Sequence, residues 1–242
     1  MKTFGLIGKN LANSFSKKYF KAKFINENIV NTQYLNFEIR NIEEVKTVFK
    51  NNNLIGLNVT IPYKESIIKY LDDLSMNAKE IGAVNTILFL KGKKIGFNTD
   101  YIGFKNSIKP LIKEEKSALI LGDGGAAKAV KYGLNKFNIK YKTVTRSGEF
   151  TYSDLTRNDI KNTHFIINTT PLGSKNMINK LPEIPYEFLN NKHILYDLNY
   201  NPKISKFLKQ GIKKNCHIKN GEEMLKIQAE ESWKIWSEIT NE

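Results

Sequence analysis

Apolar and polar positions along this chain fall into short blocks whose periodicity alternates between that of strands and that of helices. Strands are predicted in the first half at residues 3–8, 32–37, 55–59, 83–90 and 93–97. Helical spacing of apolar residues predicts helices at 16–27, 42–51, 63–71 and 73–81, with Pro62 opening the third and Gly82 ending the fourth. This alternation is typical of a mostly parallel sheet with helices on its faces.

The second half repeats the alternation and adds a long terminal helix. Strands are predicted at residues 117–121, 141–145, 164–168 and 193–197, and helices at 101–113, 128–137 and 221–239. No internal repeat or low-complexity tract interrupts the pattern. The chain is therefore expected to be an α/β protein of two units, each built on a sheet, with one helix at its end.

Composition narrows the class of protein further. Hydrophobic residues make up 40% of the 242 residues, so the chain is able to bury a substantial core and is not expected to be disordered. A single cysteine, Cys216, excludes a disulfide framework and a thiolate zinc site. The three histidines are scattered, so no bound metal is expected.

The formal net charge of +14 raises the possibility of nucleic-acid binding. Arginine, which base and phosphate recognition favours, occurs only at Arg40, Arg146 and Arg157. Lysines dispersed along the chain indicate a solvated surface instead, so no nucleic-acid partner is expected. Their positive electrostatic field would still favour an anionic ligand. No targeting signal and no apolar stretch of about 20 residues is present, so no membrane association is expected. The lone cysteine fits a cytoplasmic location.

A glycine-rich turn follows the strand at 117–121. Gly122, Gly124 and Gly125 precede a predicted helix, an arrangement that presents backbone N–H groups and the positive helix end to a pyrophosphate. The next strand ends about 20 residues further on, where NAD enzymes place an acidic residue. Here the residues are Thr145-Arg146-Ser147, which favours NADP over NAD by charge, although an ordinary surface arginine is the alternative.

Polar residues also gather at the predicted strand ends of the first half. They are Ser14, Ser16, Asn58, Thr60, Lys64, Asn85, Thr86, Asn98, Thr99 and Asp100. Each one alone has a structural explanation as a helix cap or turn former. Together they are expected at the carboxyl ends of parallel strands, where open α/β sheets bind ligands.

Lys64 and Asp100 are suited to carbonyl reduction beside a nicotinamide. When hydride reaches a carbonyl carbon, the developing alkoxide needs charge stabilisation and a proton, and a protonated Lys64 supplies both. Asp100 would hold the ammonium group in place and influence its pKa.

These motifs together resemble the shikimate dehydrogenase family. The resembling blocks are GLIG at 5–8, SFS at 14–16, NVTIPYK at 58–64, IGAVNT at 81–86, GFNTD at 96–100, LGDGGA at 121–126, INTTPLG at 167–173, YDLNYNP at 196–202 and GEEMLKIQ at 221–228. They occur in the family's order and cover essentially the whole chain. The NVTxPxK, GAVNT and NTD blocks are highly specific.

The resemblance implies a substrate-binding domain at residues 1–100 and 222–242, and a Rossmann-like NADP domain at 101–221. It implies reversible reduction of 3-dehydroshikimate to shikimate by NADPH, on the way to chorismate and the aromatic amino acids. On the substrate side, the resemblance implies that Ser14 and Ser16 bind the carboxylate. It implies that Thr60, Asn85 and Gln228 contact the hydroxyl groups, with support from Asn58, and that Tyr200 closes over the substrate. Lys64 and Asp100 are the implied catalytic pair. On the cofactor side, Gly122, Gly124, Gly125 and Ala126 would hold the pyrophosphate, Arg146 with Thr145 and Ser147 the 2′-phosphate, and Thr170, Leu198, Gly221 and Met224 the ribose or nicotinamide.

Three positions depart from the family's pattern. Asp123 replaces a small residue in the glycine turn, which is expected to weaken anion binding unless its side chain points away. The NRT-x-x-R element is reduced to Thr145-Arg146-Ser147, and the short stretch to His164 predicts a trimmed helix. Lys17 replaces a proline. A quinate/shikimate dehydrogenase using NAD, a basic nucleic-acid-binding protein and a non-catalytic relative remain as alternatives, and the chain is expected to be a monomer or a homodimer.

Overall fold

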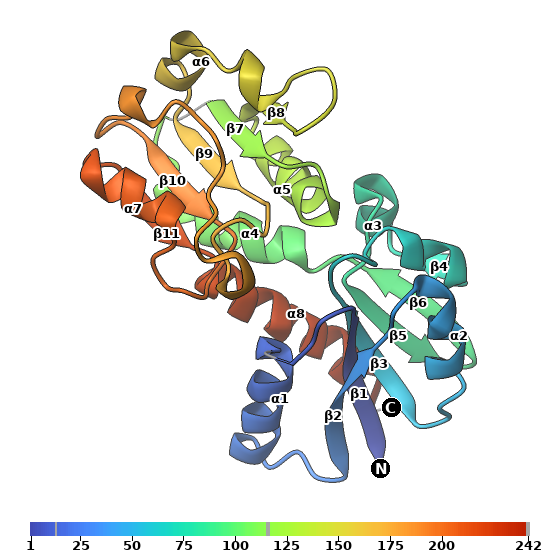
Figure 1. Cartoon of the computed structure of the whole chain (residues 1–242). Coiled ribbons are helices and arrows are strands. Elements are labelled where there is room, and N and C mark those ends of the chain that lie inside the picture. Colours follow the sequence, from blue (N-terminus) through green and yellow to red (C-terminus); the bar gives the residue numbers. More distant parts are fainter. Residues whose placement is uncertain (13, 115–116, 241–242) are drawn as a thin grey trace. The chain divides into compact units, whose positions relative to one another are not determined.

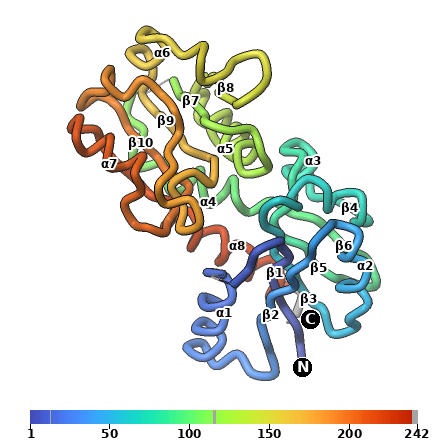
Figure 2. Tube along the Cα trace, viewed as in Figure 1, coloured from blue at the N-terminus to red at the C-terminus, as the bar shows by residue number. Residues whose placement is uncertain are grey.

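The computed structural model describes residues 1–12, 14–114 and 117–240. The chain divides into two compact units, drawn in Figure 1. Unit 1 contains Met1–Thr99 and Ala229–Glu242, and unit 2 contains Asp100–Gln228. The N-terminal residues and the C-terminal helix from Ala229 onward thus share one unit, and Figure 2 shows the same trace.

Unit 1 is built on a six-stranded sheet. Its strands are β1 (Lys2–Gly8), β2 (Thr32–Glu38), β3 (Leu54–Val59), β4 (Asp73–Leu74), β5 (Thr86–Leu90) and β6 (Lys93–Phe97), in the order β2-β1-β3-β5-β6-β4. The pairs β1–β2, β1–β3 and β4–β6 are parallel, and β3–β5 and β5–β6 are antiparallel. The antiparallel pairing of β5 with β6 follows from the short turn at Lys91-Gly92, which leaves no room for a crossover helix.

The helices of unit 1 are α1 (Phe15–Asn26), η1 (Ile42–Glu44), α2 (Val45–Val48), η2 (Ser66–Tyr70) and α3 (Met76–Ile81). Helix α3 ends at Gly82 as predicted, with φ of 69° in the left-handed region that glycine tolerates. The helix predicted at 63–71 is instead the short 3₁₀ helix η2, and the segment predicted as helix from Asp73 begins as strand β4.

Unit 2 is built on a five-stranded, fully parallel sheet. Its strands are β7 (Ser117–Leu121), β8 (Lys140–Val144), β9 (Phe165–Asn168), β10 (Ile194–Asp197) and β11 (His217–Asn220), in the order β11-β10-β9-β7-β8. Its helical segments are α4 (Asp100–Ile108), η3 (Lys109–Leu111), α5 (Gly125–Asn135), η4 (Tyr152–Asp154), α6 (Arg157–Lys161), η5 (Lys175–Met177), η6 (Tyr186–Phe188), α7 (Lys206–Lys213) and the start of α8 (Glu222–Thr240). Strand β11 and helix α7 were not predicted. The five residues of α6 agree with the trimmed helix expected before His164.

Helices cover both faces of the unit 2 sheet. Side chains alternate along β7, so Ala118 and Ile120 pack in one core with Phe104 of α4, while Leu119 and Leu121 pack in another with Phe207 of α7. A parallel sheet buried on both faces defines a doubly wound α/β unit, and the predicted α/β fold class is confirmed. Within the described ranges, no helix combines the length and apolar character needed to cross a bilayer.

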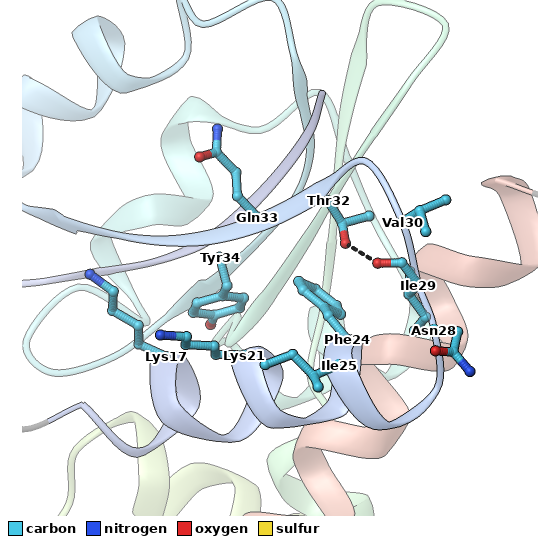
Figure 3. A pocket seen from close by; sticks show the side chains of 10 residues that line it. All are labelled: Lys17, Lys21, Phe24, Ile25, Asn28, Ile29, Val30, Thr32, Gln33 and Tyr34. Carbon is cyan, nitrogen blue, oxygen red and sulfur yellow. Dashed lines mark hydrogen bonds between the residues drawn. The ribbon is translucent and has the colours of Figure 1, made fainter.

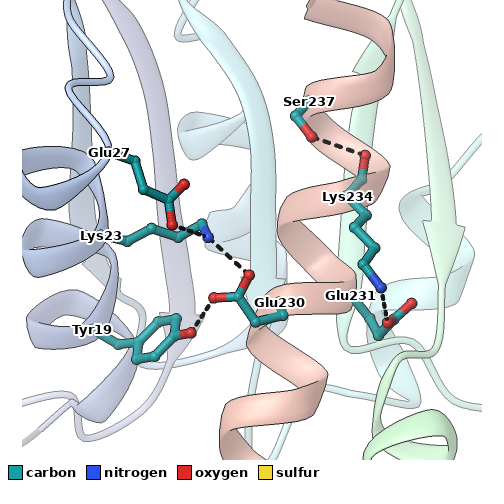
Figure 4. A network of polar contacts seen from close by, with 7 residues as sticks. All are labelled: Tyr19, Lys23, Glu27, Glu230, Glu231, Lys234 and Ser237. Carbon is teal, nitrogen blue, oxygen red and sulfur yellow. Dashed lines mark hydrogen bonds and ion pairs between the residues drawn. The ribbon is translucent and has the colours of Figure 1, made fainter.

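The C-terminal part of α8 is anchored in unit 1 by polar contacts with α1. Lys23 Nζ lies 2.7 Å from Glu27 Oε1 and 2.8 Å from Glu230 Oε2, and the Tyr19 hydroxyl donates to the other oxygen of Glu230 (Figure 4). The Lys23 side chain is only 8% exposed, so removing Glu230 would leave a nearly buried charge with one partner fewer.

Trp236 of α8 lies in a hydrophobic core of unit 1, beside Phe4 and Phe20. Its indole is fully buried and donates a 3.0 Å hydrogen bond from Nε1 to the Ile87 carbonyl. A Cβ at Gly56 of β3 would collide with the same ring, so Gly56 is what allows the indole to lie against the sheet.

Gly56→Ala is expected to lower the free energy of unfolding by about 1–3 kcal/mol, because the added methyl overpacks the Trp236 contact. Urea unfolding measures the change. Gly124→Ala is the matched control, since a Cβ there meets nothing within 4 Å, and it should cost less. Equal unfolding midpoints for Gly56→Ala and wild type would contradict this account of the packing.

Candidate active site

The glycine turn in unit 2 has the geometry expected of a phosphate-binding turn. Gly122 follows β7 with φ of +105°, and a Cβ there would lie 2.9 Å from Thr169 Oγ1 and 2.9 Å from Thr170 Cγ2. Gly124 caps α5 without a side-chain hydrogen bond, and a Cβ on it would meet no atom within 4 Å. The first N–H groups of α5 are therefore accessible at the positive end of the helix, and the turn fits a pyrophosphate.

Asp123 carries its negative charge beside this turn. Its Oδ1 forms an ion pair with Lys131 Nζ, which projects from α5 two turns further on. The carboxylate is thus compensated by a cation of the helix that follows the turn.

A pocket of about 610 Å³ lies at the end of β8. Its lining residues are Asp123, Lys142, Thr143, Thr145, Ser147, Gly148, Glu149 and Phe150. Thr145 and Ser147, both predicted for the cofactor, therefore border one cavity, and the Thr145 hydroxyl donates to the Ser147 carbonyl at 2.9 Å. Arg146 is exposed beside them and is not among the lining residues.

Strands β9 and β10 end in a buried polar cluster. Asp197 is fully buried, and its carboxylate accepts four hydrogen bonds. The donors are Ser205 Oγ at 2.5 Å, Asn199 Nδ2 at 2.9 Å, Asn199 N at 3.0 Å and Asn168 Nδ2 at 3.0 Å. Burial raises the pKa of Asp197 from 3.8 to about 6, because desolvation of the carboxylate outweighs these hydrogen bonds.

The remaining cofactor candidates lie around this cluster within unit 2. The Thr170 hydroxyl donates to Asn168 Oδ1 at 2.6 Å, and Leu198 N donates to the Asn168 carbonyl at 2.9 Å. A Cβ on Gly221 would collide with the Leu198 carbonyl, so these two backbones approach closely. Met224 is 7% exposed and packs into the core that contains α4 and α5.

In unit 1, polar side chains from β3, β5 and α8 form a second buried network. Asn58 Nδ2 lies 3.0 Å from Ser232 Oγ and 3.2 Å from the Asn85 carbonyl, and Ser232 Oγ lies 2.8 Å from Thr86 Oγ1. Asn85 is fixed by Thr99, whose N–H donates to Asn85 Oδ1 at 2.6 Å. The predicted residues Asn58 and Asn85 therefore lie in one hydrogen-bonded cluster.

The network extends to α1 through Tyr34, whose hydroxyl donates to Asn58 Oδ1 at 2.8 Å. Burial raises the Tyr34 pKa, and a side-chain hydrogen bond with Ser16 lowers it in part. Ser14 is the N-cap of α1, and its side chain accepts from Lys17 N at 3.2 Å. Thr60 follows β3, and its N–H donates to the Ile7 carbonyl at 2.9 Å.

The other substrate-side candidates are divided between the two units. Lys64 is half-buried in unit 1, where its carbonyl accepts from Val84 N at 2.7 Å. Asp100 is 6% exposed and begins α4 in unit 2. Gln228, also in unit 2, is 6% exposed and donates from Nε2 to the Leu225 carbonyl at 2.9 Å. Tyr200 is half-buried, and burial raises the pKa of its hydroxyl. The pairing of Lys64 with Asp100 stays a prediction.

Four polar residues of these networks were not singled out from the sequence as site candidates: the half-buried Asn199 and the buried Asn168, Asp197 and Ser232. The first three lie within the motifs INTTPLG and YDLNYNP, and the position of these motifs at predicted strand ends could have marked them as site residues. Ser232 lies inside a helix 174 residues away from Asn58, and no local pattern marks it.

A different hollow, of about 530 Å³, lies along α1 and β2 in unit 1 (Figure 3). Apolar Phe24, Ile25 and Val30 line it beside Lys17 and Lys21. It includes none of the predicted catalytic, substrate or cofactor residues. In the described ranges, no three His, Cys, Asp or Glu side chains are grouped so as to hold a metal ion.

Comparisons with known proteins agree with these features. The family model for the shikimate dehydrogenase substrate binding domain matches residues 6–87. The NADP(+) shikimate dehydrogenase of Clostridium botulinum strain Hall is 36% identical over 252 residues, covering 98% of this chain and 96% of that protein. The crystal structure of the Aquifex aeolicus shikimate dehydrogenase gives a TM-score of 0.88 at 37% identity, covering 98% of this chain and 92% of that one. A shikimate dehydrogenase solved in complex with NADP+ gives 0.85 at 33% identity, covering 98% and 90%.

The doubly wound unit with its glycine turn, combined with a second α/β unit rich in buried polar groups, defines a two-domain dehydrogenase of the α/β class. The near-complete coverage at 36% and 37% identity makes the assignment specific. The chain belongs to the shikimate dehydrogenase family.

The raised pKa of Asp197 predicts a defined pH dependence of stability. Between about pH 4 and 6 the folded chain binds more protons at this site than the unfolded chain, so the free energy of unfolding falls as pH rises. Asp197→Asn removes this contribution. We therefore compare the free energy of unfolding of Asp197→Asn with that of wild type at each pH. The value for the variant minus the value for wild type is expected to increase by up to about 3 kcal/mol as the pH rises from 4 to 7. Chemical denaturation at a series of pH values measures it, and parallel profiles for the two proteins would show that Asp197 does not titrate in this way.

Proposed function

We propose that this chain catalyses the reversible, NADPH-dependent reduction of 3-dehydroshikimate to shikimate, a step toward chorismate and the aromatic amino acids. The observation that carries the proposal is similarity over almost the whole chain, at 36–39% identity, to proteins named shikimate dehydrogenase (NADP(+)). The enzyme is an oxidoreductase, and its cofactor is NADP. Formation of reduced nicotinamide by purified protein with shikimate and NADP, followed by absorbance, tests the activity. No reduction would reject it.

On the cofactor side, the proposal assigns the pyrophosphate to the turn of Gly122, Gly124, Gly125 and Ala126. The accessible N–H groups at the start of α5 and the open space above Gly124 support this assignment. Arg146, with Thr145 and Ser147, would hold the 2′-phosphate, because a guanidinium group matches phosphate in charge and geometry. Thr170, Leu198, Gly221 and Met224 would contact the ribose and nicotinamide.

On the substrate side, Ser14 and Ser16 would bind the carboxylate of shikimate. Thr60, Asn85 and Gln228 would contact its hydroxyl groups, and Asn58 would hold Asn85 in place. The hydrogen bonds around Asn58 and Asn85 support these roles, since side chains with fixed orientations recognise hydroxyl groups selectively. Tyr200 would close over the substrate.

Lys64 and Asp100 would be the catalytic pair. Bound NADPH supplies the hydride for the carbonyl carbon. The Lys64 ammonium group would stabilise the negative charge that develops on the substrate oxygen and then give it a proton from Nζ. Asp100 would orient the ammonium group and favour its protonated form. In the reverse direction, neutral Lys64 would accept the proton from the hydroxyl.

The alternatives lose support on different grounds. A quinate/shikimate dehydrogenase using NAD is not favoured, because the curated relatives reported above are NADP(+) enzymes. The positive charge is proposed to serve anionic ligands rather than nucleic acid, and a monomer or homodimer is proposed. A reducing, cytoplasmic location is proposed because the lone cysteine, Cys216, is buried as a free thiol.

Lys64→Ala is expected to lower kcat by about 10²–10⁴-fold while changing the KM for shikimate much less, because the ammonium group acts mainly in the transition state. Steady-state kinetics in both directions measures this. Lys69→Ala is the matched control, since Lys69 is exposed and pairs only loosely with Glu43 at 3.6 Å. An unchanged kcat for Lys64→Ala would remove Lys64 from the mechanism.

Arg146→Ala is expected to raise the KM for NADP by about tenfold or more and to leave the KM for NAD nearly unchanged, because only NADP carries the 2′-phosphate. Kinetics with each cofactor separates the effects. Arg157→Ala serves as control, because Arg157 is exposed in the same unit and lies 5.5 Å from the Phe188 ring centre. Equal losses with both cofactors would refute the 2′-phosphate assignment.

A further inference from the structure

Asn168, Asp197 and Asn199 form a hydrogen-bonded group at the carboxyl ends of β9 and β10, called here the Asn168–Asp197–Asn199 clamp. Asp197 Oδ1 alone accepts from Asn168 Nδ2 at 3.0 Å, Asn199 Nδ2 at 2.9 Å and Asn199 N at 3.0 Å. Asp197 Oδ2 accepts from Ser205 Oγ. Asn168 and Asp197 are fully buried, so the orientation of each side chain is fixed by these partners.

The clamp also holds the loop that follows β9. Asn168 Oδ1 accepts from both the N–H and the hydroxyl of Thr170, at 3.0 and 2.6 Å. Asn199 Nδ2 lies 3.0 Å from the Thr170 carbonyl and 3.1 Å from the Leu172 carbonyl, and Asn168 Nδ2 lies 3.0 Å from the latter. The loop is therefore fixed by side chains of the two neighbouring strand ends rather than by a ladder of its own.

A third segment, between β11 and α8, is attached to the same place. Gly221 N donates to the Asn199 carbonyl at 3.1 Å, and the missing side chain of Gly221 allows the Leu198 carbonyl to approach. Leu198 N in turn donates to the Asn168 carbonyl. The clamp thus joins three segments, and each of them carries one residue proposed above for the ribose or nicotinamide: Thr170, Leu198 and Gly221.

We propose that Asn168, Asp197 and Asn199 are positioning residues that preorganise the nicotinamide half of the cofactor site while leaving its adenosine half independent. The inference rests on the proposed cofactor site. In the described part of unit 2, no hydrogen bond joins the glycine turn, or the residues that line the pocket at the end of β8, to the side chains of the clamp. The glycine turn meets the loop held by the clamp only through the close approach of Gly122 to Thr169 and Thr170, so the hydrogen bonds that fix the nicotinamide half do not also fix the adenosine half. Fixing the three segments before binding reduces the ordering cost of holding the nicotinamide.

Two probes separate the halves of the site: NADP, and adenosine 2′,5′-bisphosphate, which has the phosphorylated adenosine but no nicotinamide. In Asn199→Ala, the Kd for NADP is expected to rise about tenfold or more, whereas the Kd for the bisphosphate changes less than about twofold. Calorimetry measures both without turnover. Steady-state kinetics should show kcat/KM for NADP falling by a similar factor or more.

Two variants define the specificity of this effect. Asn190→Ala is the matched control, because Asn190 also orders a turn, accepting from Lys192 N at 2.9 Å, but precedes β10 at its amino end. It should bind both probes as wild type does. Asp197→Asn keeps an oxygen acceptor and the shape of the side chain, so it should lose less NADP affinity than Asp197→Ala.

Each outcome has a distinct meaning. If wild type binds neither probe, the proposed cofactor site fails. If wild type binds both and Asn199→Ala weakens both equally, or neither, the clamp does not act on the nicotinamide half and the inference is wrong. Should Asn199→Ala not fold, amide hydrogen exchange of cofactor-free wild type decides. Protected N–H groups at Thr170 and Asn199 support a preformed clamp, and exchange at the rate of an unprotected loop refutes it.

Discussion

Buried polar side chains need hydrogen-bond partners, and in this protein they find them in one another. This need fixes the geometry of both sheets at the strand ends where the candidate site residues lie. Removing an amide or hydroxyl group from water costs free energy unless the group finds a hydrogen-bond partner. In unit 1, Asn58 meets this requirement through Ser232 of the last helix. In unit 2, Asp197 meets it through Asn168 and Asn199. Each network leaves its members one orientation, so the strand ends present defined groups rather than mobile ones.

Local sequence was sufficient for the elements whose cause is local. The glycine turn was predicted because its glycines stand between a predicted strand and a predicted helix, and the structure gives Gly122 the positive φ that glycine tolerates. Helix α7 was missed although its sequence holds a local signal, since the Ser205 side chain caps its start by accepting from Leu208 N. It contains Gly211, which lowers helix propensity, but a Cβ there would lie 2.8 Å from Leu195 Cδ2. Close packing of α7 on β10, with Phe207 and Leu208 buried, stabilises the helix, and that contact is not visible in the local pattern.

The candidate site residues likewise divide into those that a local motif marks and those whose role depends on distant partners. Motifs identified Asn58, Asn85 and the glycine turn, because these residues stand in short, recognisable blocks. The role of Ser232 depends on a partner 174 residues away, and a serine within a helix is ordinarily a weak helix former on a solvated face. The charge of Asp123 was expected to oppose anion binding. Its ion pair with Lys131 could not be predicted, because the pair depends on the direction in which α5 leaves the turn. Sequence therefore identified candidate site residues but did not supply the contacts that support them.

Asp197 illustrates why such a supporting residue departs from what stability alone would favour. Desolvation makes its carboxylate costly, as the raised pKa shows, and an apolar residue would avoid that cost. Three donors converge on Oδ1, however, and the Ser205 hydroxyl donates to Oδ2, an arrangement that only a carboxylate accepts in full. An asparagine would place a donor opposite Ser205 and force that hydroxyl to turn. The carboxylate thus orients Asn168 and Asn199, the two side chains that bind the loop after β9, and local rules are most often broken where such an arrangement serves a site.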